Sequence, residues 1–175
     1  MPQNNPERLN AKTEKCELFT QLTEMQSKIE YDSFLFSINY IVEQFRENNF
    51  YIPKSKRFIV WSEKKQMKLI EMVLLGLPIP FLFVMSTGEE QYEVLDGSQR
   101  IQTLEAFMSN RLKLENLEIL NKLNGFTFSD IHFIQQNKFK SRILETFVVD
   151  KTMPRDIAQK IATRLDSGGT PLESL

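Results

Sequence analysis

Cysteine, histidine and tryptophan are nearly absent from this chain, with one of each among 175 residues. The single cysteine, Cys16, excludes an internal disulfide framework and suits a reducing compartment. Because His132 is the single histidine, a Ser/His or Cys/His catalytic site would have one candidate for its histidine base. His132 also has no cysteine or second histidine with which to form a zinc site. We interpret His132 as a surface histidine or one satisfied by local hydrogen bonds.

The sequence also lacks an excess of charge and a long apolar run. The formal net charge is −1, so the whole chain is not an electrostatic nucleic-acid binder, and any DNA contact must come from a local basic patch. The longest apolar stretch, residues 72–85, is too short to span a bilayer and contains Pro78 and Pro80. Residues 1–8 lack the apolar core of a signal peptide. We therefore predict a cytoplasmic protein with no membrane partner.

Hydrophobic periodicity predicts an α+β fold in which helices cover a small mixed β-sheet. A β-hairpin is expected over residues 81–95, with further extended segments at 31–36 and 144–149. Helical spacing predicts helices over residues 14–30, 38–48, 63–75 and 153–165, and another helix that starts at residues 129–130. Ser37 and Ser62 are the expected N-caps of the second and third helices, and Gly76 is the expected left-handed stop.

Residues 1–30 are predicted to form a polar tail and an amphipathic helix, and residues 31–175 a single domain. The helix places Leu18, Leu22 and Met25 on one face. That face can pack on the domain or on a partner, and we favour packing on the domain.

The chain is organised around residues 92–104, where a strand pattern changes into a helix pattern. Asp96 is the predicted N-cap of the helix, and Gln99, three residues later, can reach back to it in a variant of the capping box. A helix start that follows a strand directly presents free amides that favour an anion. Gly97 permits close approach to the backbone, and Arg100 adds a bidentate positive charge. These residues can hold a phosphate; equally, they can form an ordinary turn with Arg100 in a structural salt bridge.

A second candidate region is basic and aromatic. Residues 50–61 interleave Lys54, Lys56 and Arg57 with aromatic side chains, a pattern that suits nucleic acid or nucleotide phosphates. The same pattern also fits a half-buried extended segment with a solvated face. The lysines at positions 64, 65 and 68 are interpreted as a solvated helix face, with contact to DNA as the alternative.

Three stretches together resemble one bacterial family. Residues 94–100, Val-Leu-Asp-Gly-Ser-Gln-Arg, resemble the Asp-Gly-Gln-Gln-Arg motif in the ParB/sulfiredoxin-like N-terminal domain of GmrSD-type (type IV) restriction enzymes. Residues 53–61 resemble the family's Pro-x-x-Gln-Arg-x-x-x-Trp stretch, and residues 164–172 resemble its Arg-Leu-Asn-x-Gly-Gly-x-x-Leu stretch. The similarity runs from about residue 37 to the end, where the family usually continues into helices, so we expect a domain truncated at its C-terminus.

This resemblance implies a ParB/sulfiredoxin-like fold and a nucleotide-binding regulatory domain of a modification-dependent restriction or phage-defence system, with NTP hydrolysis as a further activity. It implies a nucleoside triphosphate with Mg²⁺ as ligand and a nuclease domain or subunit as partner, through which DNA is contacted indirectly. The catalytic candidates are Asp96, Gln99 and Arg100. The ligand-binding candidates are Gly97 and Ser98 through their amides, Arg100 through phosphate, and, in second rank, Arg57, Gly168 and Gly169.

The rival interpretation is a DNA- or protein-binding module that keeps the fold without nucleotide turnover, and a third is a structural helper in a larger assembly. Ser98, Lys56 and Asp166 depart from the family pattern and favour the rival. No HNH nuclease signature is present, so we do not expect this chain alone to be the nuclease.

Overall fold

The computed structural model describes residues 17–54 and 58–168. Its sheet has five strands in the order β1-β5-β3-β4-β2. β1 pairs with β5 and β3 pairs with β4 in antiparallel fashion, whereas β3–β5 and β4–β2 are parallel pairs. The predicted mixed sheet and α+β class are thereby confirmed. The strands are β1 (Tyr31–Ser37), β2 (Phe50–Tyr51), β3 (Leu82–Gly88), β4 (Gln91–Asp96) and β5 (Ile143–Val149).

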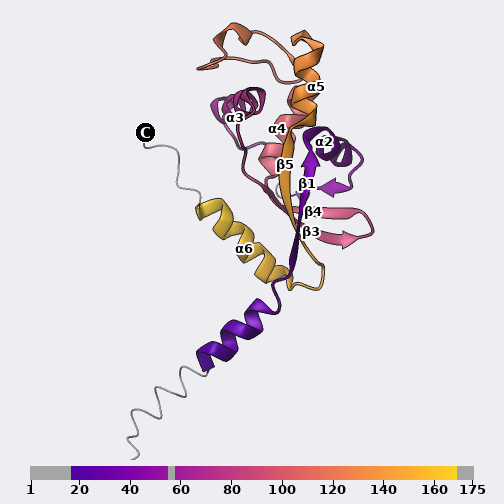
Figure 1. The fold of residues 1–175 in the computed structure, drawn as a ribbon, viewed down its shortest axis with the longest axis vertical. Helices are drawn as coiled ribbons and strands as arrows, with labels where there is room; N and C mark the ends of the chain where they lie inside the picture. Colours follow the sequence, from indigo (N-terminus) through magenta and orange to yellow (C-terminus); the bar gives the residue numbers. More distant parts are fainter. Residues whose placement is uncertain (1–16, 55–57, 169–175) are drawn as a thin grey trace, which may run out of the picture.

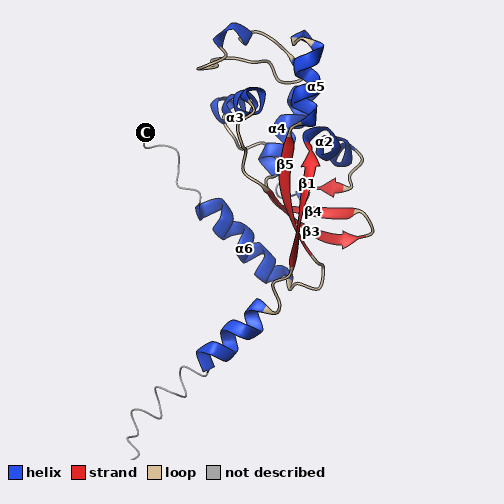
Figure 2. Cartoon of the chain, viewed as in Figure 1, coloured by secondary structure: helices blue, strands red, loops and turns tan. Residues whose placement is uncertain are grey.

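Helices cover both faces of this sheet (Figures 1 and 2). The α-helices are α2 (Ile38–Arg46), α3 (Glu63–Leu75), α4 (Ser98–Met108), α5 (Phe133–Ser141) and α6 (Arg155–Gly168), and the short 3-10 turns are η2 (Asn121–Leu123) and η3 (Phe128–Asp130). In the part of the chain that the structure describes, no helix is both long and apolar enough to cross a bilayer.

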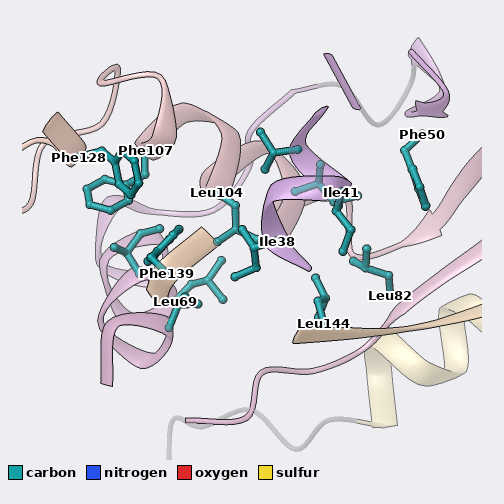
Figure 3. Packing of buried hydrophobic residues seen from close by; sticks show 14 of the residues in the cluster. Ile38, Ile41, Phe50, Leu69, Leu82, Leu104, Phe107, Phe128, Phe139 and Leu144 are labelled. Atoms are coloured by element: carbon teal, nitrogen blue, oxygen red, sulfur yellow. The ribbon is translucent and has the colours of Figure 1, made fainter. Parts of the chain in front are cut away.

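The core is divided by the sheet into two clusters. Along β3, Leu82 and Val84 face the larger cluster with α2, α3, α4 and α5, whereas Phe83 and Met85 face the smaller cluster with α6. This alternation follows from the two-residue period of a strand. In the larger cluster, Phe107 packs against the rings of Phe128 and Phe139, and Leu82 lies on the sheet side (Figure 3).

The predicted N-caps of α2 and α3 and the predicted C-terminal stop of α3 are confirmed. Ser37 caps α2 by accepting a hydrogen bond from the Tyr40 amide at 3.2 Å, and Ser62 caps α3 through the Lys65 amide at 3.4 Å. Gly76 ends α3 in the left-handed conformation, with φ of 76°. These ends were predictable because each cap is made within four residues.

Two predicted helices differ from the structure at their ends. The helix expected from residues 129–130 begins instead at Phe133, after η3, because a capping box between Thr127 and Asp130 closes that short turn first. His132 is the N-cap of α5, its Nδ1 accepting from the Ile134 amide, which agrees with a locally satisfied surface histidine. The last helix begins at Arg155 and continues through Gly168.

The N-terminal helix does not pack on the domain as we favoured. Its described part, residues 17–26, projects away from the sheet (Figure 1). Leu18, Phe19 and Leu22 are 64%, 69% and 56% exposed. An amphipathic pattern predicts an apolar face but not the surface that covers it, and this domain offers that face no partner among the described residues.

Candidate nucleotide pocket at the start of α4

The strand β4 ends at Asp96 and helix α4 begins at Ser98, as the change of hydrophobic period predicted. The predicted cap is wrong, however. Gly97 is the N-cap, in the left-handed conformation with φ of 94°, and no side chain caps this helix. Asp96 still pairs with Phe83 in the sheet. Because a glycine can take the left-handed turn, the chain leaves the strand one residue later than an Asp cap would require.

The carboxylate of Asp96 forms an ion pair with Arg100 instead. Arg100 Nη2 lies 2.7 Å from Asp96 Oδ2 and 2.8 Å from the Phe81 carbonyl oxygen, so one nitrogen donates to both. The two side chains are 12% and 18% exposed. Arg100 Nε is buried and has no hydrogen-bond partner among the described residues. The salt-bridge interpretation of Arg100 is thus observed, and the same guanidinium keeps one buried donor unused.

The carboxylate of Glu93, on β4, pairs with Arg155 of α6. This carboxylate is 2% exposed, accepts from Arg155 Nη2 at 2.5 Å and lies 3.1 Å from the Tyr51 hydroxyl. Burial raises the pKa of the Tyr51 phenol, a hydrogen bond with Thr87 lowers it, and the charge of Glu93 raises it again, leaving the net pKa above 10.0. The neutral phenol therefore remains a donor to Glu93, and this cluster ties α6 to β4.

Gln99 does not form the predicted capping box. Its side chain turns away from the helix start and bonds to backbone groups at residues 58, 60 and 61. Periodicity within the helix cannot show this, because the partners lie about forty residues earlier in the chain.

Residues 95–100, at the end of β4 and the start of α4, line a pocket of about 480 Å³. Its wall combines the start of α4 with Val60, Trp61 and Lys65 from one side and with Ala162 and Thr163 of α6 from the other. Lys65 and Arg100 supply positive charge and Asp96 is the carboxylate of the lining. The sequence interpretation had placed Lys65 on a solvated face and had not considered Ala162 and Thr163. In the sequence, Lys65 lies close to the motif stretch 53–61, and Ala162 and Thr163 lie close to the stretch 164–172. This closeness to the motifs is the sequence signal that points to them.

The ligand candidates of second rank are Arg57, Gly168 and Gly169. Arg57 and Gly169 lie outside the described residues. Gly168 was expected in a glycine loop, but it is the last residue of α6, because the helix continues past residue 165.

In the described part of the chain, no group of three or more His, Cys, Asp or Glu side chains could hold a metal ion. Beside phosphates, Mg²⁺ is commonly held by one or two carboxylates together with phosphate oxygens and water, and Asp96 is the carboxylate in the described lining.

A family model described as "GmrSD restriction endonuclease, N-terminal domain" matches residues 38–175. The chain belongs to this family. The match begins within one residue of the point where the motif similarity was predicted to begin, and it confirms that resemblance. Membership identifies this GmrSD N-terminal domain as a component of a restriction, or phage-defence, system.

No curated protein and no solved structure matches the chain. The ParB/sulfiredoxin-like arrangement of this GmrSD N-terminal domain therefore stays a prediction.

Proposed function

We propose that the pocket at the start of α4 binds the phosphates of a nucleoside triphosphate, and that this domain is the nucleotide-binding regulatory part of a modification-dependent restriction system. One observation carries the proposal. Residues 60–61 of one motif stretch, residues 95–100 of another, and α6, the helix on which the third motif begins, meet at one pocket although they are far apart in the sequence.

The pocket has the donors that a phosphate requires. The first turn of a helix leaves amides without intrahelical acceptors, and no side chain caps α4. Gly97 and Ser98 border the pocket there, and their backbone gives an anion access to these amides. Arg100, whose Nε has no hydrogen-bond partner among the described residues, lies in the same turn, and Lys65 adds a second positive charge. A bound Mg²⁺ would supply further neutralisation of phosphate charge.

NTP hydrolysis is a further part of the proposal, and it depends on Asp96. Asp96 is the carboxylate in the described lining, so it is the group there best able to orient a water. Its ion pair with Arg100 fixes the direction of the carboxylate.

Isothermal titration calorimetry with ATP and with GTP, each with Mg²⁺, tests the binding step. Arg100→Ala should weaken binding by about 1.5–3 kcal/mol, the range for a hydrogen bond to a charged group, which is roughly a 10- to 150-fold change in Kd. Arg111→Ala is the matched control, because Arg111 is 61% exposed and borders a different pocket. Absence of binding by the wild-type chain, or equal losses in both variants, would refute the proposal.

A DNA-binding module remains the second candidate, favoured by the exposed lysines 64, 65 and 68 on α3. Phosphate contacts release counterions, so this module would bind DNA with an affinity that falls steeply with salt concentration. A gel-shift series at increasing salt, without nucleotide, separates the two candidates. Salt-dependent DNA binding together with a flat calorimetric titration would favour the module.

A further inference from the structure

The carboxamide of Gln99 is hydrogen-bonded to backbone groups of a distant segment. Its Oε1 accepts from the Val60 amide at 2.7 Å and from the Trp61 amide at 3.2 Å, and its Nε2 donates to the Phe58 carbonyl at 2.8 Å. Three hydrogen bonds from one side chain thus join the first turn of α4 to residues 58–61.

Within the part of the chain that the structure describes, few other contacts hold this segment. Residues 58–61 form neither helix nor strand, and Phe58 and Val60 are 77% and 83% exposed. At its end, Trp61 packs partly against the larger core cluster, and its carbonyl accepts from Gln66 Nε2 at 3.1 Å. Burial therefore fixes only the Trp61 end, whereas Gln99 fixes the path of the backbone before it.

The same segment is a wall of the proposed pocket, since Val60 and Trp61 border it beside Gly97 and Ser98. Because these bonds use Oε1 and one hydrogen of Nε2, they fix the orientation of the Gln99 carboxamide relative to segment 58–61.

We infer that Gln99 is a positioning residue, which holds segment 58–61 in place as the wall of the pocket, rather than a residue that acts on the ligand. That this wall bounds a nucleotide site rests on the proposed function; that Gln99 holds the segment does not. The inference changes the role assigned to Gln99 from the sequence, where it was expected to contact the ligand or the helix cap.

Two substitutions of Gln99 distinguish the hydrogen bonds that Oε1 accepts from the one that Nε2 donates. Gln99→Met keeps the length of the side chain and removes all three hydrogen bonds. Gln99→Glu keeps an oxygen that can accept from the Val60 and Trp61 amides, and replaces the donor to the Phe58 carbonyl by a second acceptor. Gln102→Met is the matched control, because Gln102 lies on the same helix and its Nε2 donates to the Ser98 carbonyl, not to the segment.

Hydrogen exchange of the Val60 and Trp61 amides, measured by NMR on the ligand-free full chain, is the decisive test. Gln99→Met should lower the protection of both amides about tenfold, Gln99→Glu should largely restore it, and Gln102→Met should leave it unchanged. Trp61 is the single tryptophan, so its emission should shift to longer wavelength in Gln99→Met alone. Unchanged protection in Gln99→Met, or loss without rescue in Gln99→Glu, overturns the inference.

Nucleotide titrations of the same proteins keep the two proposals distinguishable. If the wild type binds ATP or GTP, Gln99→Met should weaken binding several-fold and Gln99→Glu should lose more, because its charge repels phosphate. If the wild type binds neither, the proposed function fails, while the exchange data still decide the role of Gln99.

Discussion

Gly97 occupies a position where a methyl group should be costly for two separate reasons. Its φ of 94° lies in the left-handed region, which costs a residue with a Cβ roughly 1–2 kcal/mol. A Cβ at this position would also lie 2.3 Å from Leu82 Cδ2, and Leu82 is completely buried between β3 and the helices. Overpacking of a closed core typically costs about 1–3 kcal/mol. Gly97→Ala should therefore lower the free energy of unfolding by roughly 2–5 kcal/mol.

Two other glycines separate these contributions. Gly125 has nearly the same φ, 93°, but its added Cβ would meet only Lys113 Cε at 3.9 Å. Gly125→Ala should therefore show the backbone cost alone, about 1–2 kcal/mol. Gly88 has neither a positive φ nor a close neighbour, so Gly88→Ala should change stability by less than about 1 kcal/mol.

Urea denaturation of the three variants, followed by circular dichroism, measures the series directly. The order of loss should be Gly97 first, Gly125 second and Gly88 last. Equal losses for Gly97→Ala and Gly125→Ala would refute the reasoning, because they would show that Leu82 moves aside without cost and that the corner is not tightly packed.

Three further predictions concern other charged groups and the activity of the chain. Arg100→Ala should lower the melting temperature of the ligand-free domain, and a double-mutant cycle with Asp96→Asn should show coupling of about 0.5–3 kcal/mol between these groups; independent effects would contradict the ion pair. Burial raises the pKa of Glu105, but hydrogen bonds from Ser109 and Arg111 outweigh it and hold that pKa below 4.5. Glu105 therefore stabilises the fold above pH 4.5 and loses this contribution as the pH falls through its lowered pKa, so the stability gap between wild type and Glu105→Gln should close in acid. Incubated with Mg²⁺, an NTP and modified or unmodified DNA, the purified chain should leave the DNA intact; cleavage that co-purifies with the chain through successive columns would contradict the assignment of cutting to a nuclease partner.

The features that sequence reasoning predicted correctly are those decided by neighbouring residues. The caps Ser37 and Ser62 and the stop at Gly76 depend on contacts within one helical turn. The hairpin β3–β4 and the passage from β4 to α4 follow from periodicity.

The errors occurred where another residue competes for a side chain or for the turn. Asp96 has the chemistry of a cap, yet Arg100 takes its carboxylate and Gly97 makes the turn. Gln99 has the spacing of a capping box, yet three backbone groups at residues 58–61 occupy it. Such competition is settled by tertiary structure, which a local pattern does not contain.

For the same reason, the sequence predicted only part of the pocket lining. Asp96, Gly97, Ser98, Gln99 and Arg100 were candidates because they adjoin one another in the sequence. Lys65 and Thr163 were not, because only the packing of α3 and α6 around the start of α4 brings them to the lining.

The most direct test of the central claim is an NMR titration of the ¹⁵N-labelled chain with ATP or GTP and Mg²⁺. The account predicts saturable shifts that are largest at the Gly97 and Ser98 amides and at the Arg100 Nε–H, a donor that has no hydrogen-bond partner within residues 17–54 and 58–168. Resonances of Arg111 and Lys113, which border a different pocket, should move little. Unchanged spectra, or shifts centred on Arg111 and Lys113, would contradict the claim that the start of α4 is a nucleotide site.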